Sequence, residues 1–321
     1  MRCQIRCFAF VFGLFAAVTA PAATTTDSDD IASQYKAEGY ELVWHDEFNK
    51  PGQPDPANWT YETGFVRNNE AQFYQPSNAF VDDGLLVIEA RRETVDNPAH
   101  DPSSNNWRQQ RKQSEYTSAS VTTRGLHDWT FGRFEMRGRI DIRPGLWPAW
   151  WTVGSNQPWP SSGEIDMMEY YRGMLLANAC WKADDDRRWS AKWDATRHPI
   201  EDFKPDPDQP GDTWTEQFHT WRMDWDEEQI VLSVDGNVLN TIDLTETINP
   251  DGSNPFHRPH YMIANVAIGG DNGGDPSHTD FPARYEIDWI RVYQKPEHQI
   301  QPSADADNET SDTHEDQQHD D

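Results

Sequence analysis

Cysteine is scarce in this chain of 321 residues, which contains three: Cys3, Cys7 and Cys180. The first two lie in an N-terminal segment of the secretory type, so the processed protein would retain Cys180 alone and could form no intramolecular disulfide. Stability must therefore come from a hydrophobic core, and roughly 300 residues are enough to build one large domain.

Long hydrophobic runs are also scarce. Residues 8–18 form the main one, and it is too short to span a bilayer. It follows Arg2 and Arg6 and precedes Ala20-Pro-Ala22, a pattern typical of a cleavable secretory signal. We therefore expect residues 1–22 to be a signal peptide. The mature protein is expected to be secreted, either extracellular or periplasmic, and to have no membrane partner.

Basic residues are too few to balance the acidic ones: 27 Lys and Arg face 55 Asp and Glu, which gives a net charge of −28. This balance argues against a nucleic-acid partner, and against strongly anionic polymers unless a local basic patch compensates. The polar residues 23–39 are expected to form a flexible arm. Residues 296–321 contain no Lys, Arg or aromatic residue, so we expect an acidic disordered tail there.

Helical periodicity is hard to find over ten residues or more. Between residues 40 and 295 the sequence alternates instead, most clearly over residues 132–142, where Phe134, Met136 and Ile140 share one face. Asp235-Gly236 between two strand-like segments predicts a β-hairpin. Strands are expected at residues 85–90, 229–234, 237–244, 261–268 and 285–293. Many short strands separated by Gly, Pro and Asn predict an all-β antiparallel sandwich or jelly roll.

Aromatic residues, in contrast, are plentiful, and the chain contains 15 Trp. An indole ring offers a flat apolar face on which a sugar ring can stack, although packing in the core is the more frequent role of any single Trp. In the segment Gly145-Leu-Trp-Pro-Ala-Trp-Trp151, strand alternation places Trp147 and Trp151 on one face and Trp150 on the other.

The most informative segment is Glu164-Ile-Asp-Met-Met-Glu169, which places three carboxylates within six residues. On a strand, Glu164 and Asp166 share a face, and Glu169 joins them only if a β-bulge inserts one residue. Close carboxylates cannot all ionise freely, so at least one pKa should rise. Glycoside hydrolysis requires two such carboxyl groups. The competing interpretation is a half-exposed strand whose acids face solvent.

An ordered set of motifs runs along the chain: Arg67-Asn-Asn-Glu-Ala-Gln-Phe-Tyr74, Tyr116-Thr-Ser-Ala119, Phe131-Gly-Arg-Phe-Glu135, Gly145-Leu-Trp-Pro-Ala-Trp-Trp151, Gly163-Glu-Ile-Asp-Met-Met-Glu-Tyr170, Phe218-His219 with Trp225, Val234-Asp-Gly236, Asn265-Val-Ala-Ile-Gly-Gly270 and Asp288-Trp-Ile-Arg-Val-Tyr293. This set resembles glycoside hydrolase family 16, in its laminarinase-like branch with a bulged Glu-x-Asp-x-x-Glu sequence. The resemblance implies one catalytic domain over residues 40–295, a β-jelly-roll sandwich of two curved antiparallel sheets with an open concave cleft.

The resemblance also implies residue roles. Glu164 would be the nucleophile, Glu169 the acid/base and Asp166 an assisting carboxylate. The implied substrate-binding residues are Asn68, Glu70, Arg124, Trp147, Trp151, Trp181 and Asn265. Catalysis would need no cofactor. Many relatives carry a structural Ca²⁺ far from the reaction, which here would lie around Glu47, Gly84 and Asp288, largely on main-chain carbonyls.

One position departs from the resemblance. Laminarinase-like members usually place a His soon after the catalytic strand, and this chain has Cys180 in the matching segment. A thiol does not replace an imidazole as a hydrogen-bond partner of comparable strength. A buried structural Cys is a simpler interpretation than a nucleophilic one.

The expected function is that of a secreted, retaining endo-β-glucanase acting on β-1,3 or mixed β-1,3/1,4 glucan, as a monomer whose partner is the polysaccharide. The nearest alternative is an endo-hydrolase of a marine galactan of the agarose, porphyran or carrageenan type. A transglycosylase is a further alternative. A non-catalytic carbohydrate-binding jelly roll is disfavoured, because all three carboxylates are present.

Overall fold

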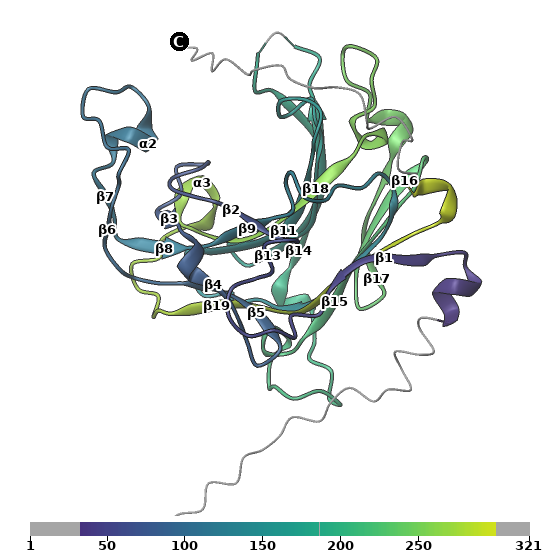
Figure 1. Cartoon of the computed structure of the whole chain (residues 1–321), viewed down its shortest axis with the longest axis horizontal. Coiled ribbons are helices and arrows are strands. Elements are labelled where there is room, and N and C mark those ends of the chain that lie inside the picture. The colour runs from purple at the N-terminus through teal and green to yellow at the C-terminus, as the bar shows by residue number, and fades with distance from the viewer. Residues whose placement is uncertain (1–32, 186, 300–321) are drawn as a thin grey trace, which may run out of the picture. The chain divides into compact units, whose positions relative to one another are not determined.

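The computed structural model describes residues 33–185 and 187–299 (Figure 1). Residues 33–40 belong to a separate compact unit from residues 41–299. They contain a short helical turn, residues 33–37, followed by a hydrogen bond from the Tyr40 amide to the Tyr35 carbonyl (2.8 Å). The expected signal peptide, most of the expected arm and most of the expected acidic tail lie outside the described residues.

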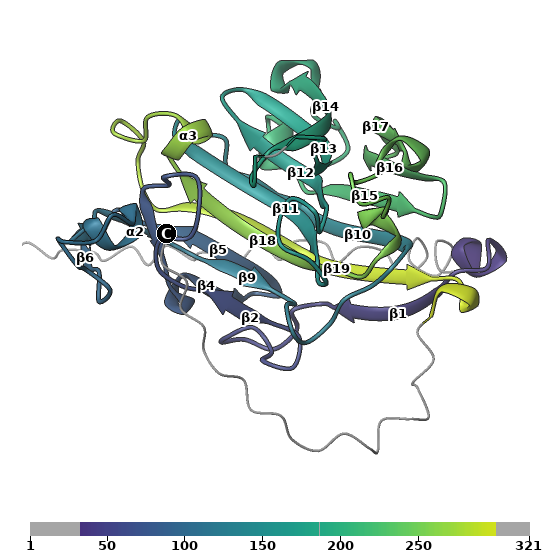
Figure 2. The ribbon, with the colours of Figure 1, turned by 90° about the horizontal axis from the view of Figure 1, so that it is seen from above.

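The larger unit contains two large antiparallel sheets. An eight-stranded sheet has the order β17-β16-β15-β10-β19-β5-β4, and β1 also pairs with β19 (Figure 2). Its strands are β1 (Glu41–Asp46), β4 (Ala79–Asp82), β5 (Leu85–Ala90), β10 (Gly132–Arg139), β15 (His219–Trp225), β16 (Gln229–Val234), β17 (Asn237–Asp243) and β19 (Ala283–Gln294).

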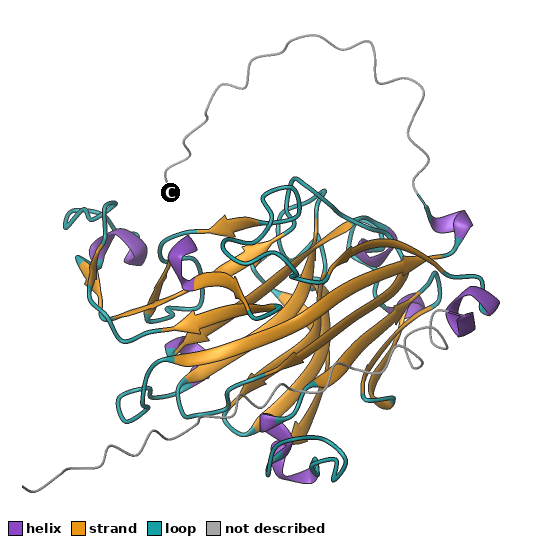
Figure 3. Ribbon diagram, turned by 60° about the horizontal axis from the view of Figure 1, so that its bottom comes forward, coloured by secondary structure: helices purple, strands orange, loops and turns teal. Residues whose placement is uncertain are grey.

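A seven-stranded sheet has the order β14-β13-β12-β11-β18-β9-β2. Its strands are β2 (Thr60–Glu62), β9 (Ser120–Thr122), β11 (Leu146–Gly154), β12 (Glu164–Tyr171), β13 (Met174–Lys182), β14 (Ala191–Pro199) and β18 (His260–Ile268). Figure 3 shows how little helix accompanies these strands. None of the helices in the described ranges is both long and apolar enough to cross a membrane.

Short elements complete the domain. The strands β3 (Gln72–Tyr74) and β8 (Tyr116–Ser118) pair in parallel, and β6 (Val95–Asp96) pairs antiparallel with β7 (Gln113–Ser114). The helices are α2 (Trp107–Gln110) and α3 (Gly270–Gly273), with 3-10 turns η1 (Pro76–Asn78), η2 (Ile200–Asp202), η3 (Trp214–Glu216), η4 (Leu244–Glu246), η5 (Pro255–His257) and η6 (Pro296–His298).

The alternating sequence explains how the two sheets pack. Phe134 and Met136 of β10 are buried in one large cluster that also contains Trp150 of β11 and Ile165 of β12, so the inner faces of the two sheets share a core. The expected hairpin is confirmed: Asp235 and Gly236 both have positive φ, 48° and 76°, as a type I′ turn requires. These observations confirm the predicted all-β sandwich.

Candidate active site

A β-bulge in β12 brings the three carboxylates to one face. Asp166 pairs with Asn178 of β13 and Glu169 pairs with Leu176, so β12 has one residue more than its partner between these pairs. Met167 and Met168 are both buried in the core cluster, which shows where the extra residue is accommodated. Glu169 therefore regains the face of Glu164 and Asp166, as the spacing predicts.

Each carboxylate receives a hydrogen bond from a neighbouring side chain. Trp159 Nε1 donates to Glu164 Oε2 (3.0 Å), and Trp147 Nε1 donates to Glu169 Oε1 (2.7 Å). Between them, Asn178 Nδ2 lies 3.3 Å from Asp166 Oδ2 and 3.4 Å from Glu169 Oε2. The cluster is thus held in place by N–H donors, each of which favours the ionised form of its partner.

Burial raises the pKa of all three carboxyl groups, because it removes water from the charged form. It raises the pKa of Asp166 to about 7, although the Asn178 hydrogen bond lowers it. The pKa values of Glu164 and Glu169 are raised well above their usual range, first by burial and then by neighbouring carboxylates. Arg67 opposes this at Glu164 and Arg197 opposes it at Glu169. The three carboxyl groups therefore do not all ionise together near neutral pH.

This raised pKa has a consequence for stability. In the unfolded chain Asp166 would ionise near the ordinary aspartate pKa of 3.8, whereas the folded protein keeps the proton up to about pH 7. The folded state binds more protons in that window, so stability falls as pH rises through it. We expect Asp166→Asn to melt about 3 °C above the wild type at pH 8, with a smaller gain at pH 4. Equal shifts at both pH values in calorimetric melts would contradict the raised pKa.

The segment Arg67–Glu70 lies beside the carboxylates although it is about 100 residues away in sequence. The Arg67 guanidinium lies 4.9 Å from the centre of the Trp151 ring and forms an ion pair with Glu62. Asn68 and Glu70 are bonded to each other (Nδ2 to Oε1, 3.2 Å), and Gln72 Nε2 also donates to Glu70 (2.7 Å). Glu70 is buried, so its carboxylate organises this segment internally.

The neighbouring loop that carries α2 supports the same segment. Arg108 donates to the main-chain carbonyl of Val66, and Arg111 donates to those of Asn69 and Glu70. The positive φ of Asn68 (53°) leaves this backbone in a conformation that few residues adopt readily, so external support is needed. The loop over residues 97–112 therefore fixes a side of the candidate site.

Asn265 orients one of the two predicted stacking indoles. Its Oδ1 accepts a hydrogen bond from Trp151 Nε1 (2.8 Å), and its Nδ2 donates to the Tyr74 hydroxyl (3.1 Å). Asn265 is buried, so both ends of its amide are satisfied by side chains. Arg124, another predicted binding residue, is exposed and lies 5.6 Å above the Tyr261 ring.

Trp181, which was predicted to bind substrate, lies in the core between the two sheets. Cys180 pairs with Glu164 and shares its face, so the next residue points the opposite way. Trp181 belongs to the core cluster and packs edge-on against Phe256. The expectation that Trp181 stacks on sugar is therefore wrong. Cys180 itself is buried, and burial raises the pKa of its thiol well above the usual range, so it is not a poised nucleophile.

Sequence reasoning missed Asn178, Arg67 and Trp159. Asn178 could have been found, because Gly173 marks a turn between β12 and β13, and the structure confirms positive φ at Arg172 and Gly173. Counting residues outward from this turn and allowing for the bulge pairs Asn178 with Asp166. Trp159 could have been suspected from its closeness to Glu164 in sequence. Arg67 reaches Trp151 only through tertiary folding, so no local pattern indicates it.

The expected calcium positions lie at or next to three paired strands: Glu47 directly follows β1, Gly84 directly precedes β5, and Asp288 belongs to β19, with which both strands pair. The side chains do not fit the ion, however. The Glu47 carboxylate is bound to Arg291 (2.8 and 2.9 Å) and the Asp288 carboxylate to Arg137 (2.6 Å). Within residues 33–185 and 187–299, no three His, Cys, Asp or Glu side chains are grouped to hold a metal ion. A calcium ion at the expected place would therefore depend mainly on main-chain carbonyls, as the resemblance implies.

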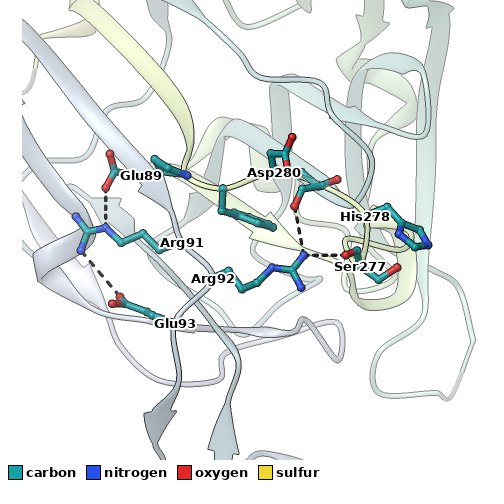
Figure 4. A pocket seen from close by; sticks show the side chains of 10 residues that line it. Glu89, Arg91, Arg92, Glu93, Ser277, His278 and Asp280 are labelled. Atoms are coloured by element: carbon teal, nitrogen blue, oxygen red, sulfur yellow. Dashed lines mark hydrogen bonds and ion pairs between the residues drawn. The ribbon is translucent and has the colours of Figure 1, made fainter.

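A separate hollow lies between the end of β5 and the loop before β19 (Figure 4). Both of its arginines are already bound: Arg91 pairs with Glu89 (2.6 Å), and Arg92 donates to the carbonyls of Ser277 and Thr279 (2.9 and 3.2 Å). This hollow contains none of the β12 carboxylates. We interpret its arginines as structural clamps between two loops.

Cleavage of a glycosidic bond needs two carboxyl groups that can differ in protonation, beside surfaces that hold sugar. The β12 face provides this chemistry on an antiparallel two-sheet fold, which defines the class as glycoside hydrolase. Sequence comparison gives the family: the profile of glycosyl hydrolases family 16 matches residues 73–291, and the chain belongs to this family.

Two relatives are named as enzymes that act on β-glucans. The chain is 33% identical over 279 residues to a β-glucanase of Rhodothermus marinus, covering 81% of this chain and 87% of that protein. The catalytic domain of an endo-1,3-β-glucanase (laminarinase) from Thermotoga petrophila superposes with a TM-score of 0.65 at 31% identity, over 80% of this chain and 98% of that one.

A third relative comes from work on endo-acting O-glycanases that members of the human gut microbiota express to initiate mucin breakdown. It superposes with a TM-score of 0.72 at 34% identity, over 81% of this chain and 92% of that one. The fold and enzyme class are thus shared by proteins whose named substrates differ.

Proposed function

We propose that this chain is a secreted, retaining endo-β-glucanase that hydrolyses β-1,3 or mixed β-1,3/1,4 glucan. The observation that carries the proposal is the bulge in β12, which gathers Glu164, Asp166 and Glu169 on one face with raised pKa values. The β-glucanase and laminarinase relatives support the choice of glucan.

Glu164 is assigned as the nucleophile by its position, because it is the first acid of the Glu-x-Asp-x-x-Glu motif, and Arg67 and the Trp159 N–H partly offset the effect of burial on its ionised form. Its carboxylate attacks the anomeric carbon while the bond from that carbon to the glycosidic oxygen breaks. Glu169 gives its proton to the departing oxygen, and a glycosyl ester remains on Glu164. Glu169 then removes a proton from water, whose oxygen attacks the same carbon and frees Glu164. Two inversions at one carbon give retention.

The remaining residues are assigned supporting roles. Asp166 lies between the two glutamates, and Asn178, which is bonded to both Asp166 and Glu169, holds these two carboxyl groups in position. Trp147 and Trp151 lie beside the reacting groups with most of their surface buried, so any contact with sugar is through the edge that remains exposed, and the exposed Asn68 offers its amide to sugar hydroxyls. No cofactor is assigned to catalysis.

A polysaccharide panel tests this function. Incubation with laminarin, mixed-linkage glucan, agarose, porphyran, κ-carrageenan and mucin should release reducing ends from the two glucans, with oligosaccharides of several lengths as early products. Proton NMR during early hydrolysis should show the β-anomer first. Turnover of agarose, porphyran or carrageenan alone, or an α-anomer first, would overturn the assignment.

One observation favours a second candidate substrate. Cys180 replaces the His expected beside Glu164, and a buried neutral thiol cannot offer the hydrogen bonds of an imidazole. The contacts to sugar next to the nucleophile therefore differ from the expected laminarinase pattern. A β-galactoside-containing glycan, as in a galactan or a mucin O-glycan, is the alternative that the same panel detects.

Three further expectations stay predictions. Export is tested by N-terminal sequencing of the protein recovered from outside the cytoplasm, where cleavage after residue 22 is expected. A monomer is tested by light scattering. Structural calcium on main-chain carbonyls is tested by calorimetric titration of the metal-free protein with Ca²⁺, where the absence of a binding isotherm would remove it.

A further inference from the structure

Two large indole side chains are exposed close to the candidate site. Trp189 is 59% exposed and Trp193 is 48% exposed, although most large apolar side chains among the described residues are buried. Both belong to the turn and strand that follow β13, outside the motifs of the family resemblance. Two exposed indoles four residues apart, beside a candidate site for sugar, are candidates for contact with a ligand.

The strand register places Trp193 on the carboxylate face. Glu164 of β12 pairs with Cys180 of β13, and Cys180 pairs with Trp193 of β14. Directly opposite residues of antiparallel strands share a face of the sheet, so Trp193 and Glu164 project to the same side. Two strand spacings separate them, roughly 10 Å between their backbones. Figure 2 shows β12, β13 and β14 side by side.

Trp189 is connected to the nucleophile through a second indole. Its ring is stacked on Trp159, with ring centres 6.4 Å apart and planes inclined by 27°. Trp159 in turn donates its Nε1 hydrogen bond to Glu164 Oε2 (3.0 Å). Aromatic side chains therefore connect Glu164, through Trp159, to Trp189 in the turn between β13 and β14.

We propose that Trp189 and Trp193 form a platform for sugar residues of the polysaccharide beyond the ring that Glu164 attacks. The inference rests on the proposed function, because the occupant is the substrate chain itself. Continuity with Glu164 selects this occupant over a protein partner: a polysaccharide bound at the carboxylates and continuing across β13 meets Trp193 about two strand spacings later. Indole faces stack on pyranose rings without requiring a charge.

Substrate length provides the test. Trp193→Ala and Trp189→Ala should each lower kcat/KM on the polysaccharide about tenfold, mainly through KM, which corresponds to about 1.4 kcal/mol. The shortest oligosaccharide that the enzyme cleaves should be hydrolysed at the wild-type rate. Trp193→Phe should restore part of the loss, because a phenyl ring keeps a flat face. Trp289→Ala is the matched control, since Trp289 lies on β19 beside Arg291 (4.1 Å) in the other sheet.

The outcomes separate the platform from the catalytic assignment. Unchanged kinetics on the polysaccharide, or an equal loss on short and long substrates, overturns the platform while leaving the glucanase intact. If the wild type cleaves no polysaccharide of the panel, the proposed function fails instead. Affinity electrophoresis in laminarin-, mixed-linkage glucan- or mucin-containing gels then decides: a retardation that Trp193→Ala abolishes supports the platform, and equal mobility of the two proteins overturns it.

Discussion

Replacing Glu164 by glutamine is expected to lower kcat on glucan by about 10⁴-fold or more, the order found when a covalent nucleophile is removed from a hydrolase. The amide has nearly the same shape as the carboxylate and can still accept the Trp159 hydrogen bond, so the local fold should survive. It cannot form the glycosyl ester, because an amide oxygen is a poor nucleophile. Loss of turnover with a melting temperature that does not fall is the expected result.

The effect on stability should even favour the variant. Burial and the neighbouring carboxylates raise the pKa of Glu164, so an ionised Glu164 is unfavourable in the folded protein. An uncharged replacement removes that unfavourable term above the unfolded pKa, and the melting temperature at pH 8 should not fall. Exposed Glu246→Gln serves as the control for the same chemical change far from the site. Retention of a tenth or more of the wild-type rate by Glu164→Gln would remove Glu164 from the nucleophile role.

The bulge is the part of the site that sequence alone predicts best. The alternation rule leaves Glu169 on the wrong face, and a single inserted residue is the smallest change that corrects it. The structure places that residue at Met167–Met168, where two consecutive apolar side chains can both enter the core. The two adjacent methionines are themselves evidence for the bulge. Consecutive side chains of a regular strand point to opposite faces, so both can enter the core only where the strand has a bulge.

Residues whose role depends on distant parts of the chain were not predictable. Arg67 reaches Trp151 because a loop between β2 and β3 packs over the sheet, and that packing depends on Arg108 and Arg111 some 40 residues further on. No periodicity encodes such a contact. The error at Trp181 is of another kind, since the register from the Arg172–Gly173 turn already assigns it to the core face.

The tryptophans also fall into two groups: those whose orientation the local sequence predicts, and those whose position depends on the tertiary fold. Strand alternation separates Trp150 from Trp151 correctly, and the structure buries the first in the core while the second lies beside the carboxylates. Trp193 needed the register of three strands before its relation to Glu164 could be recognised. Local sequence patterns thus predict to which face of the sheet a side chain points. Its neighbours on that face depend on the order and register of the strands.

Replacing Glu169 by glutamine should produce a loss that depends on the leaving group. On polysaccharide we expect kcat to fall by about 10²–10⁴-fold, the usual contribution of a general acid. On an aryl β-glucoside or laminaribioside with a nitrophenolate leaving group, formation of the glycosyl ester should remain within about tenfold of the wild type, because that leaving group needs no proton. Glu164→Gln should be slow on both substrates, which separates the two roles.

The second chemical step should then become rate-limiting in Glu169→Gln. Water attacks the ester slowly without a base, so the ester should accumulate and a burst of nitrophenolate should precede slow turnover. Mass spectrometry of the peptide that contains Glu164 should show the added sugar mass. The alkaline limb of the pH profile, which reports loss of the Glu169 proton at a pKa raised mainly by burial and Asp166, should disappear in this variant. An alkaline limb that persists unchanged, or a sugar attached to Glu169 in the wild type, would reverse the assignment of the two glutamates.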